Sequence, residues 1–388
     1  MSVSSLSARS SVDSLRSISS LGSAPDKLAP SVDGPMVWRK SELDPTKYVC
    51  HLTATEVAEI RLAVIHFRLS GLTRPSISKE TFPLSEHLSS KLAALSKEIH
   101  SGSGVAVLRG LNAARFNDEE AVIAFVGVCA HICAERATDS YANQTLSHIR
   151  DATHEKVPQW ATNIGLAGSK ITAKMDFHND RFSGDILAMH VRNDGGPGNG
   201  GEQFVSSFWS IYNTLLEKDP AVLETMMEAQ WPFELKQKNA DPYLELGPTL
   251  LFSKNKPICQ LVKAPLLGSA HIPRDPSMPE LSKEQIHAIH MVEEIAQEVC
   301  TQLDRQEGDI QLINNLSIMH ARAAYGKTDK PSSRHLLRMF LRDPENAWDK
   351  PMSFKRNFED PFTRGRVQEI SVHDFDPWRK ISGRESHG

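Results

Sequence analysis

The sequence predicts a mainly β protein with helices (α+β), in which an antiparallel jelly roll is braced by helices. Two observations support this fold class. Amphipathic helical patterns occupy the first half of the chain, whereas strand patterns dominate from about residue 184. The two kinds of element do not alternate regularly, which argues against a doubly wound parallel sheet and favours a helix-braced jelly roll.

Helices are predicted first along the chain. Thr53 and Glu56 form a T-x-x-E capping box before an apolar stripe of helical spacing, and Gly71 is placed to end that helix. A second amphipathic stripe covers residues 84–99. A buried strand and a third helix are then predicted at residues 104–110 and 118–133.

Strands follow in the second half. Residues 249–262 (TLLFSKNKPICQLV) are typical of a hairpin that turns at Asn255 and Lys256. One helix interrupts the strands, opened by a capping box of Ser282 and Gln285 and extending to about residue 300. The remaining predicted strands are residues 184–191, 202–208, 309–315 and 335–342.

Composition and charge exclude several classes of protein. The 388 residues are 40% hydrophobic and carry a net charge of −4, and they show no basic excess of the kind that nucleic-acid binders need. No apolar run approaches the roughly 20 residues that span a bilayer. Five scattered cysteines without a Cys-x-x-Cys pair favour reduced thiols inside a cell. We expect a small-molecule substrate as partner, no nucleic acid and no membrane, with the oligomeric state left open.

The N-terminal residues differ from the rest of the chain. Residues 1–22 are rich in serine and poor in acids, and such a segment cannot bury enough apolar surface to fold. We therefore predict a disordered tail at 1–35 and a single domain at 36–388, with a jelly-roll core at about 104–345. A cytoplasmic location is expected. The alternative is mitochondrial, because transit peptides share the Ser- and Arg-rich bias.

A His-x-Asp pair, His178 and Asp180, is a candidate for metal binding. In a strand, residues i and i+2 point to the same face, whereas in a helix they would lie about 200° apart. His320, after the strand at 309–315, supplies a third ligand, and two histidines with one carboxylate leave open positions on iron. Alone, each signal is weak: the pair can be a chance match, and His320 can be a structural histidine at a strand end.

Residues 334–342 (RHLLRMFLR) are predicted to form a strand with two different faces. One face carries Arg334, Arg338 and Arg342, and the other carries leucine and methionine. Guanidiniums inside a barrel are costly unless they meet anions, and arginine is the natural bidentate partner of a carboxylate. The alternative is an edge strand with its arginines in water.

In order and spacing, these motifs resemble the taurine dioxygenase-like (TauD/TfdA) family of 2-oxoglutarate oxygenases, in the branch common in filamentous fungi. His178-x-Asp180 is followed after 140 residues by His320, then by Arg334 and Arg338 in an Arg-x-x-x-Arg step. Looser stretches such as GVAVLRG, LSHIRD and GGEQFVSSFWSIYN extend the resemblance over roughly residues 75–345.

The resemblance implies the double-stranded β-helix form of the jelly roll (clavaminate synthase-like). It also implies that Fe(2+), 2-oxoglutarate and O2 are used, and that succinate and CO2 are released while a small organic substrate is oxidised. Hydroxylation is the expected outcome. By position, His178, Asp180 and His320 would be the catalytic iron ligands, and Arg334 would hold the distal carboxylate of 2-oxoglutarate.

The resemblance also implies roles for three further residues. Gln203 replaces a threonine that often assists 2-oxoglutarate binding, and its amide can still donate a hydrogen bond. Arg338 matches a position that can contact an anionic substrate group, and Lys174 lies where a substrate-facing polar group can occur. The alternatives are a structural cation for Arg338 and an exposed strand lysine for Lys174.

Rival functions stay open on the sequence alone. The same iron centre could desaturate, epoxidise or cyclise its substrate. A catalytically silent jelly-roll binding module would be favoured by loss of any ligand or of Arg334, yet all four residues are present. A zinc hydrolase on the same ligands would have no use for Arg334.

Overall fold

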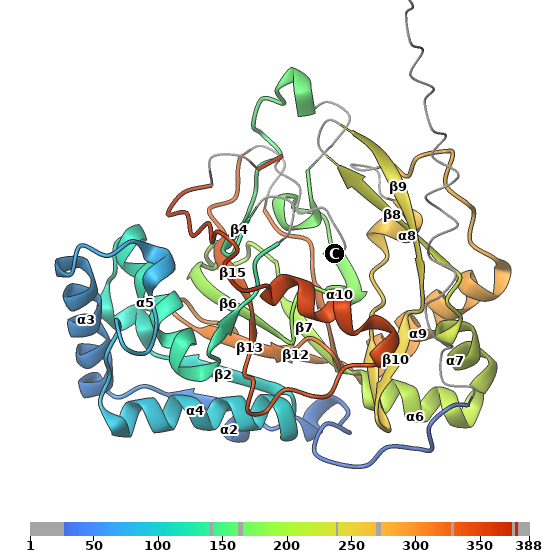
Figure 1. The fold of residues 1–388 in the computed structure, drawn as a ribbon, viewed down its shortest axis with the longest axis horizontal. Helices are drawn as coiled ribbons and strands as arrows, with labels where there is room; N and C mark the ends of the chain where they lie inside the picture. The colour runs from blue at the N-terminus through green and yellow to red at the C-terminus, as the bar shows by residue number, and fades with distance from the viewer. Residues whose placement is uncertain are drawn as a thin grey trace, which may run out of the picture.

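The computed structural model describes residues 27–139, 143–161, 166–237, 240–268, 273–326, 330–374 and 377–378. Two groups of helices flank a pair of facing sheets (Figure 1). The helices α3, α4 and α5 gather on one side, and α6, α7 and α9 gather on the other. Within the described ranges, no helix is both long and apolar enough to cross a membrane.

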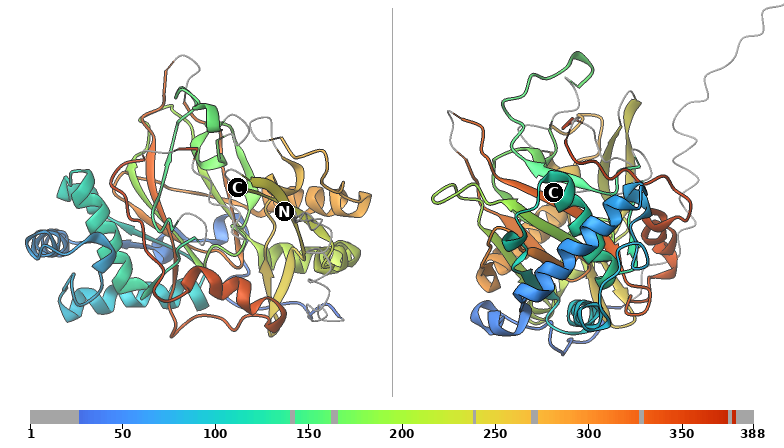
Figure 2. Two further views of the ribbon diagram at one scale, coloured as in Figure 1. Left: turned by 45° about the horizontal axis from the view of Figure 1, so that its top comes forward. Right: turned by 90° about the vertical axis from the view of Figure 1, so that its left-hand side faces the viewer.

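The three predicted N-terminal helices are present as α3 (Ala54–Leu69), α4 (Glu86–Ser101) and α5 (Asp118–Ile132), after a short α2 (Pro45–Tyr48). The predicted capping box is confirmed, because Thr53 Oγ1 accepts from the Glu56 N–H and the Glu56 carboxylate accepts from the Thr53 N–H. The inner faces of α3, α4 and α5 pack with strand residues into one core, over the outer face of the larger sheet (Figure 2, right).

The larger sheet has the strand order β1-β2-β13-β6-β15-β3, with β4 also paired to β15. Its pairs are antiparallel except for the parallel β1 and β2. The smaller sheet has the order β12-β7-β14-β5 and is antiparallel. The strands of the larger sheet are β1 (Val49–His51), β2 (Val105–Arg109), β3 (Glu135–Arg136), β4 (Ser147–Arg150), β6 (Ile186–Asn193), β13 (Ile310–Asn314) and β15 (His335–Arg342). Those of the smaller sheet are β5 (Met175–His178), β7 (Gln203–Ser207), β12 (Thr301–Leu303) and β14 (Ile318–Arg322).

The two predicted faces of β15 are confirmed. Leu337, Met339 and Leu341 pack against the core of α3, α4 and α5. Leu336 and Phe340 point the other way and join a cluster that includes residues of the smaller sheet. Because β15 pairs with β6 on one side and with β3 and β4 on the other, the edge-strand alternative is wrong.

The second half holds more helix than predicted. The predicted helix is α9 (Lys283–Val299), and its capping box is confirmed. Four helices of this half were not predicted: α6 (Phe208–Lys218), α7 (Pro220–Met227) and the short α8 (Ala264–Leu267) and α10 (Lys355–Glu359). The helix α6 begins directly at the end of β7, where Ser207 caps it, so no glycine or proline marks the change from strand to helix.

Several further strands were also not predicted, among them β1, β3, β4 and β12. The segment with His320 is itself the strand β14, and a hairpin of β8 (Trp231–Gln237) and β9 (Ala240–Gly247) precedes the predicted one. The predicted hairpin is present as β10 (Leu250–Ser253) and β11 (Lys256–Cys259). Its turn falls at Lys254 and Asn255, one residue earlier than predicted, and Lys254 has a left-handed φ of 56°.

The predicted boundary of the tail at residue 35 is wrong. Residues 1–26 lie outside the described residues, but Tyr212 Oη donates to the Ala29 carbonyl and Asn213 exchanges two hydrogen bonds with Val32. Val32 itself is buried. These contacts come from α6, a helix without a recognisable sequence signal. The sheet likewise begins before residue 104, because β1 pairs with β2.

Candidate metal centre

His178 and His320 are cross-strand neighbours in the smaller sheet. His178 ends β5 and lies directly opposite His320 of β14 in the antiparallel register. Their ring centroids are 4.2 Å apart. Asp180 follows just beyond the end of β5, so only the first residue of the His-x-Asp pair lies in a strand. The structure thus brings together three side chains that the sequence separates by up to 142 positions.

The ligand atoms of these side chains are close enough to bind one ion. Asp180 Oδ1 lies 4.0 Å from His178 Nε2, and Asp180 Oδ2 lies 3.4 Å from His320 Nε2. All three ligand atoms lie within 4.8 Å of one another, which is true of no other such group in the described residues. Two imidazoles and one carboxylate form the donor set that leaves open positions on ferrous iron.

The protonation of His178 suits a metal ligand. Its Nδ1–H donates to the Asp176 carbonyl at 2.8 Å, which keeps the proton on Nδ1 and leaves the Nε2 lone pair facing the other ligands. Burial, together with the neighbouring His320, lowers the pKa of His178 to about 3. The imidazole is therefore neutral at physiological pH. The residues present fit an iron(II) ion.

Asn315 holds the backbone of Asp180 in place. The Asp180 N–H donates to Asn315 Oδ1 at 2.9 Å, and Asn315 Nδ2 donates to the carbonyls of Asp180 and Gly184 at 2.7 and 3.0 Å. These groups are buried. Asp180 lies outside the paired strands, so its backbone is held by the Asn315 side chain, whereas the backbone of His178 is held by strand pairing. Its neighbour Asn314 instead ties the turn to the Ile99 carbonyl of α4.

Replacing Asn315 with alanine is expected to destabilise the protein by about 1–3 kcal/mol, because buried polar groups of the Asp180 backbone lose their partners. Affinity for Fe(II) should fall roughly 10- to 100-fold, as for other groups that orient metal ligands. Denaturant unfolding and anaerobic metal titration measure the two effects. Asn314→Ala is the control, expected to lose stability but to keep metal affinity. Wild-type affinity in Asn315→Ala would contradict this role.

A cavity between the two sheets opens onto the metal ligands. Its polar lining consists of Ser169, His178, Gln203, His320, Arg322, Arg334 and Arg338, and the rest of its lining is apolar. The cavity thus joins the candidate ligands to the arginines at the start of β15. An apolar wall with a few convergent polar groups is typical of a small-molecule site.

Arg334 is a buried cation without a counter-ion among the described residues. Its side chain is 2% exposed, and neither Nε nor Nη1 has a hydrogen-bond partner there. Burial, and then the nearby Arg305 and Arg322, lower the pKa of Arg334 to about 9. Gly201 leaves room for this side chain, because a Cβ there would lie 2.9 Å from Arg334 Nε. A buried guanidinium without a counter-ion is costly, which favours an anion as the ligand of this part of the cavity.

The other predicted site residues divide into two groups. Gln203 lines the cavity, and its buried Oε1 has no partner among the described residues. Arg338 also lines it; its Nε–H donates to Ser147 Oγ at 3.1 Å, and burial lowers its pKa against the attraction of Asp180. Lys174 does not line the cavity. Its side chain is 74% exposed and pairs with Asp176 at 3.1 Å, as the alternative for this lysine expected.

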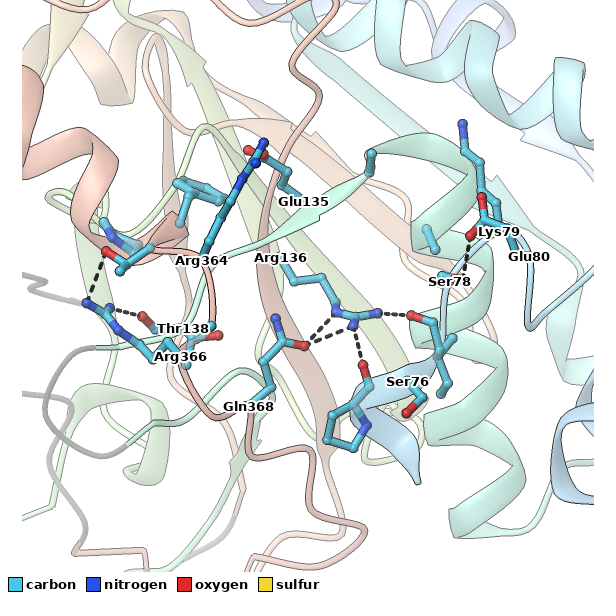
Figure 3. A pocket seen from close by; sticks show the side chains of 18 residues that line it. Ser76, Ser78, Lys79, Glu80, Glu135, Arg136, Thr138, Arg364, Arg366 and Gln368 are labelled. Carbon is cyan, nitrogen blue, oxygen red and sulfur yellow. Dashed lines mark hydrogen bonds between the residues drawn. The ribbon is translucent and has the colours of Figure 1, made fainter. Parts of the chain in front are cut away.

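A second hollow, lined by β3 and residues 361–368, offers a contrast (Figure 3). Arg136 there donates to the carbonyls of Pro75 and Ile77 and to the Gln368 side chain. Each of its nitrogens has a partner, so this arginine fastens chain segments together. Arg334 has no such anchors on Nε and Nη1.

A jelly roll with this donor set and this anion site defines an iron(II)- and 2-oxoglutarate-dependent dioxygenase. The family model of the taurine catabolism dioxygenase TauD, TfdA family matches residues 69–340. Taurine hydroxylase-like protein SAT17 of Stachybotrys chartarum is 31% identical, over 92% of this chain and 92% of that protein. FR-33289 synthase of Streptomyces rubellomurinus is 25% identical, over 83% of this chain and 93% of that protein. The chain belongs to the TauD/TfdA family.

Solved structures confirm the predicted fold class. Asparagine oxygenase with Fe(II), hydroxyasparagine and succinate matches with a TM-score of 0.55 at 13% identity, over 78% of this chain and 98% of that one. The non-haem iron oxygenase OrfP with Fe and alpha-ketoglutaric acid matches with a TM-score of 0.52 at 14% identity, over 76% and 94%. The predicted family and its use of Fe(II), 2-oxoglutarate and O2 are likewise confirmed.

Proposed function

We propose that this dioxygenase hydroxylates a small organic substrate that carries an acidic group. His178, Asp180 and His320 hold the iron, and Arg334 holds the distal carboxylate of 2-oxoglutarate. The observation that carries the proposal is the buried guanidinium of Arg334, whose Nε and Nη1 have no partner among the described residues, in the cavity that His178 and His320 also line. A zinc hydrolase would have no use for that cation.

The protein contributes to the reaction by orienting the metal ligands and the co-substrate and by keeping water out of the cavity. Bound iron supplies the activation of O2, which no amino-acid side chain provides. The Asp176 carbonyl sets the tautomer of His178, and Asn315 fixes Asp180. The Gln203 amide contacts the co-substrate from the cavity wall. The apolar remainder of the lining keeps water from the reacting centre.

Arg338 is the residue that we assign to the substrate's acidic group. It lines the cavity and is buried, whereas the exposed Lys174 has no part in the proposed site. Hydroxylation is supported by the name of the taurine hydroxylase-like relative and by the hydroxylated amino acids bound in asparagine oxygenase and OrfP. A cytoplasmic location and the absence of a nucleic-acid partner stay predictions from the sequence.

Anaerobic addition of Fe(II) and then 2-oxoglutarate to the purified protein tests the proposal. A weak visible charge-transfer band of the chelated oxo acid is expected. Acidic small molecules are then screened by succinate release, and mass spectrometry separates gain of one oxygen from the loss of hydrogen that desaturation or cyclisation would give. Absence of the band in folded, iron-loaded protein would favour a binding module instead.

A further inference from the structure

Arg322 is a second buried arginine in the cavity, and its position follows from β14. It lies two residues after His320, so both side chains project from the same face of the strand. Arg322 is 6% exposed and lines the cavity. Its Nη2 donates to the carbonyls of Ile171, at 3.0 Å, and Ala173. Its Nε and Nη1 have no hydrogen-bond partner in the part of the chain that the structure describes.

The guanidinium of Arg322, with its unpartnered Nε and Nη1, lies close to that of Arg334. Both guanidiniums approach the ring of Tyr325, with Cζ 4.7 Å from its centroid for Arg322 and 4.9 Å for Arg334. Gln203 is the direct cross-strand partner of Arg322 in the β7–β14 register. Two guanidiniums with unpartnered N–H groups therefore lie close together, beside Gln203, whose Nε2–H donates to Met189 Sδ at 3.7 Å and whose Oε1 has no partner among the described residues.

We propose that Arg322 is a second positioning residue for 2-oxoglutarate, donating from its free edge to the distal carboxylate that Arg334 also binds. This inference rests on the proposed function. A carboxylate has about four lone-pair sites, so it can accept from both arginines and from Gln203. Arg322 lies two positions after His320, about 7 Å along β14, so it could reach the end of a bound 2-oxoglutarate that is remote from the iron ligands.

The anchoring of Arg322 explains why it suits this task. Its Nη2 is fixed on the segment that leads into β5, so little side-chain freedom remains to be lost when a ligand binds. Substitution by lysine would keep the charge but lose the planar guanidinium. Only the guanidinium can donate hydrogen bonds to the protein from one side and to the ligand from the other.

The test compares two oxo acids that differ only in the distal carboxylate. Calorimetry of the full chain, anaerobic and loaded with Fe(II), gives Kd for 2-oxoglutarate and for 2-oxovalerate. In Arg322→Met, Kd for 2-oxoglutarate is expected to rise roughly 10- to 100-fold, as for loss of hydrogen bonds to a charged group. Kd for 2-oxovalerate should change less than about threefold, and Arg322→Lys should fall between.

Arg136→Met is the matched control, because Arg136 also binds backbone carbonyls but lies in the second hollow (Figure 3). It should lose stability and keep the wild-type preference for 2-oxoglutarate. A wild-type preference in Arg322→Met, or in Arg322→Lys if the methionine variant does not fold, would overturn the inference and leave Arg322 a structural role. A wild-type protein without any preference would instead overturn the proposed function.

Discussion

Replacing Asp180 with alanine is expected to abolish succinate release and to lower Fe(II) affinity by at least about 100-fold, more than the loss of a group that merely orients a ligand. Asp180 is fully buried and supplies the only carboxylate of the ligand group. It is also the charge that favours the cationic form of buried Arg338. We therefore expect the alanine variant to be less stable as well, because it leaves a buried cation uncompensated.

Asp180→Asn keeps the shape of the side chain but removes its charge, so comparison with Asp180→Ala separates the effect of lost packing from the effect of the lost carboxylate. Asp176→Asn is the matched control, because Asp176 lies in β5, four positions before Asp180, and its carboxylate pairs with Lys174 and Lys263. Iron content after dialysis, the charge-transfer band and succinate release are measured for all variants. An Asp180→Ala protein that binds iron stoichiometrically and turns over would show that the ligand set is wrong.

Replacing Arg334 with methionine is expected to raise Kd for 2-oxoglutarate on the order of 100-fold, since a buried carboxylate would lose charge-assisted hydrogen bonds. The ligand-free protein should be no less stable than wild type, because the substitution removes a buried cation that has no counter-ion among the described residues. Titration of the charge-transfer band gives the affinity, and denaturant unfolding gives the stability.

Arg342→Met is the control for this pair of effects. Arg342 lies on the same strand but pairs with Asp185 and Glu359, so its loss should destabilise the protein and leave Kd for 2-oxoglutarate unchanged. The two arginines should thus show opposite patterns of stability and affinity. An Arg334→Met protein that loses stability but binds 2-oxoglutarate normally would place the anion site elsewhere.

Much of the fold was predictable because its signals are local. The capping boxes at Thr53 and Ser282 lie within four residues, and the alternation along residues 334–342 correctly separated a core face from a cavity face. The helix α6 was missed because no turn residue separates it from β7. That omission also misplaced the end of the tail, whose partners lie on α6.

The candidate site likewise has residues that could be predicted from the sequence and residues that could not. His178, Asp180, His320 and Arg334 could be predicted as candidates for binding iron and an anion, since their chemistry and order are recognisable in the sequence. The side chains that support them become visible only in the folded protein. Asn315 meets Asp180 across 135 positions, Arg322 joins Arg334 beside Tyr325, and Lys174 turns to solvent. Such contacts depend on strand pairing between distant segments, which no local pattern encodes.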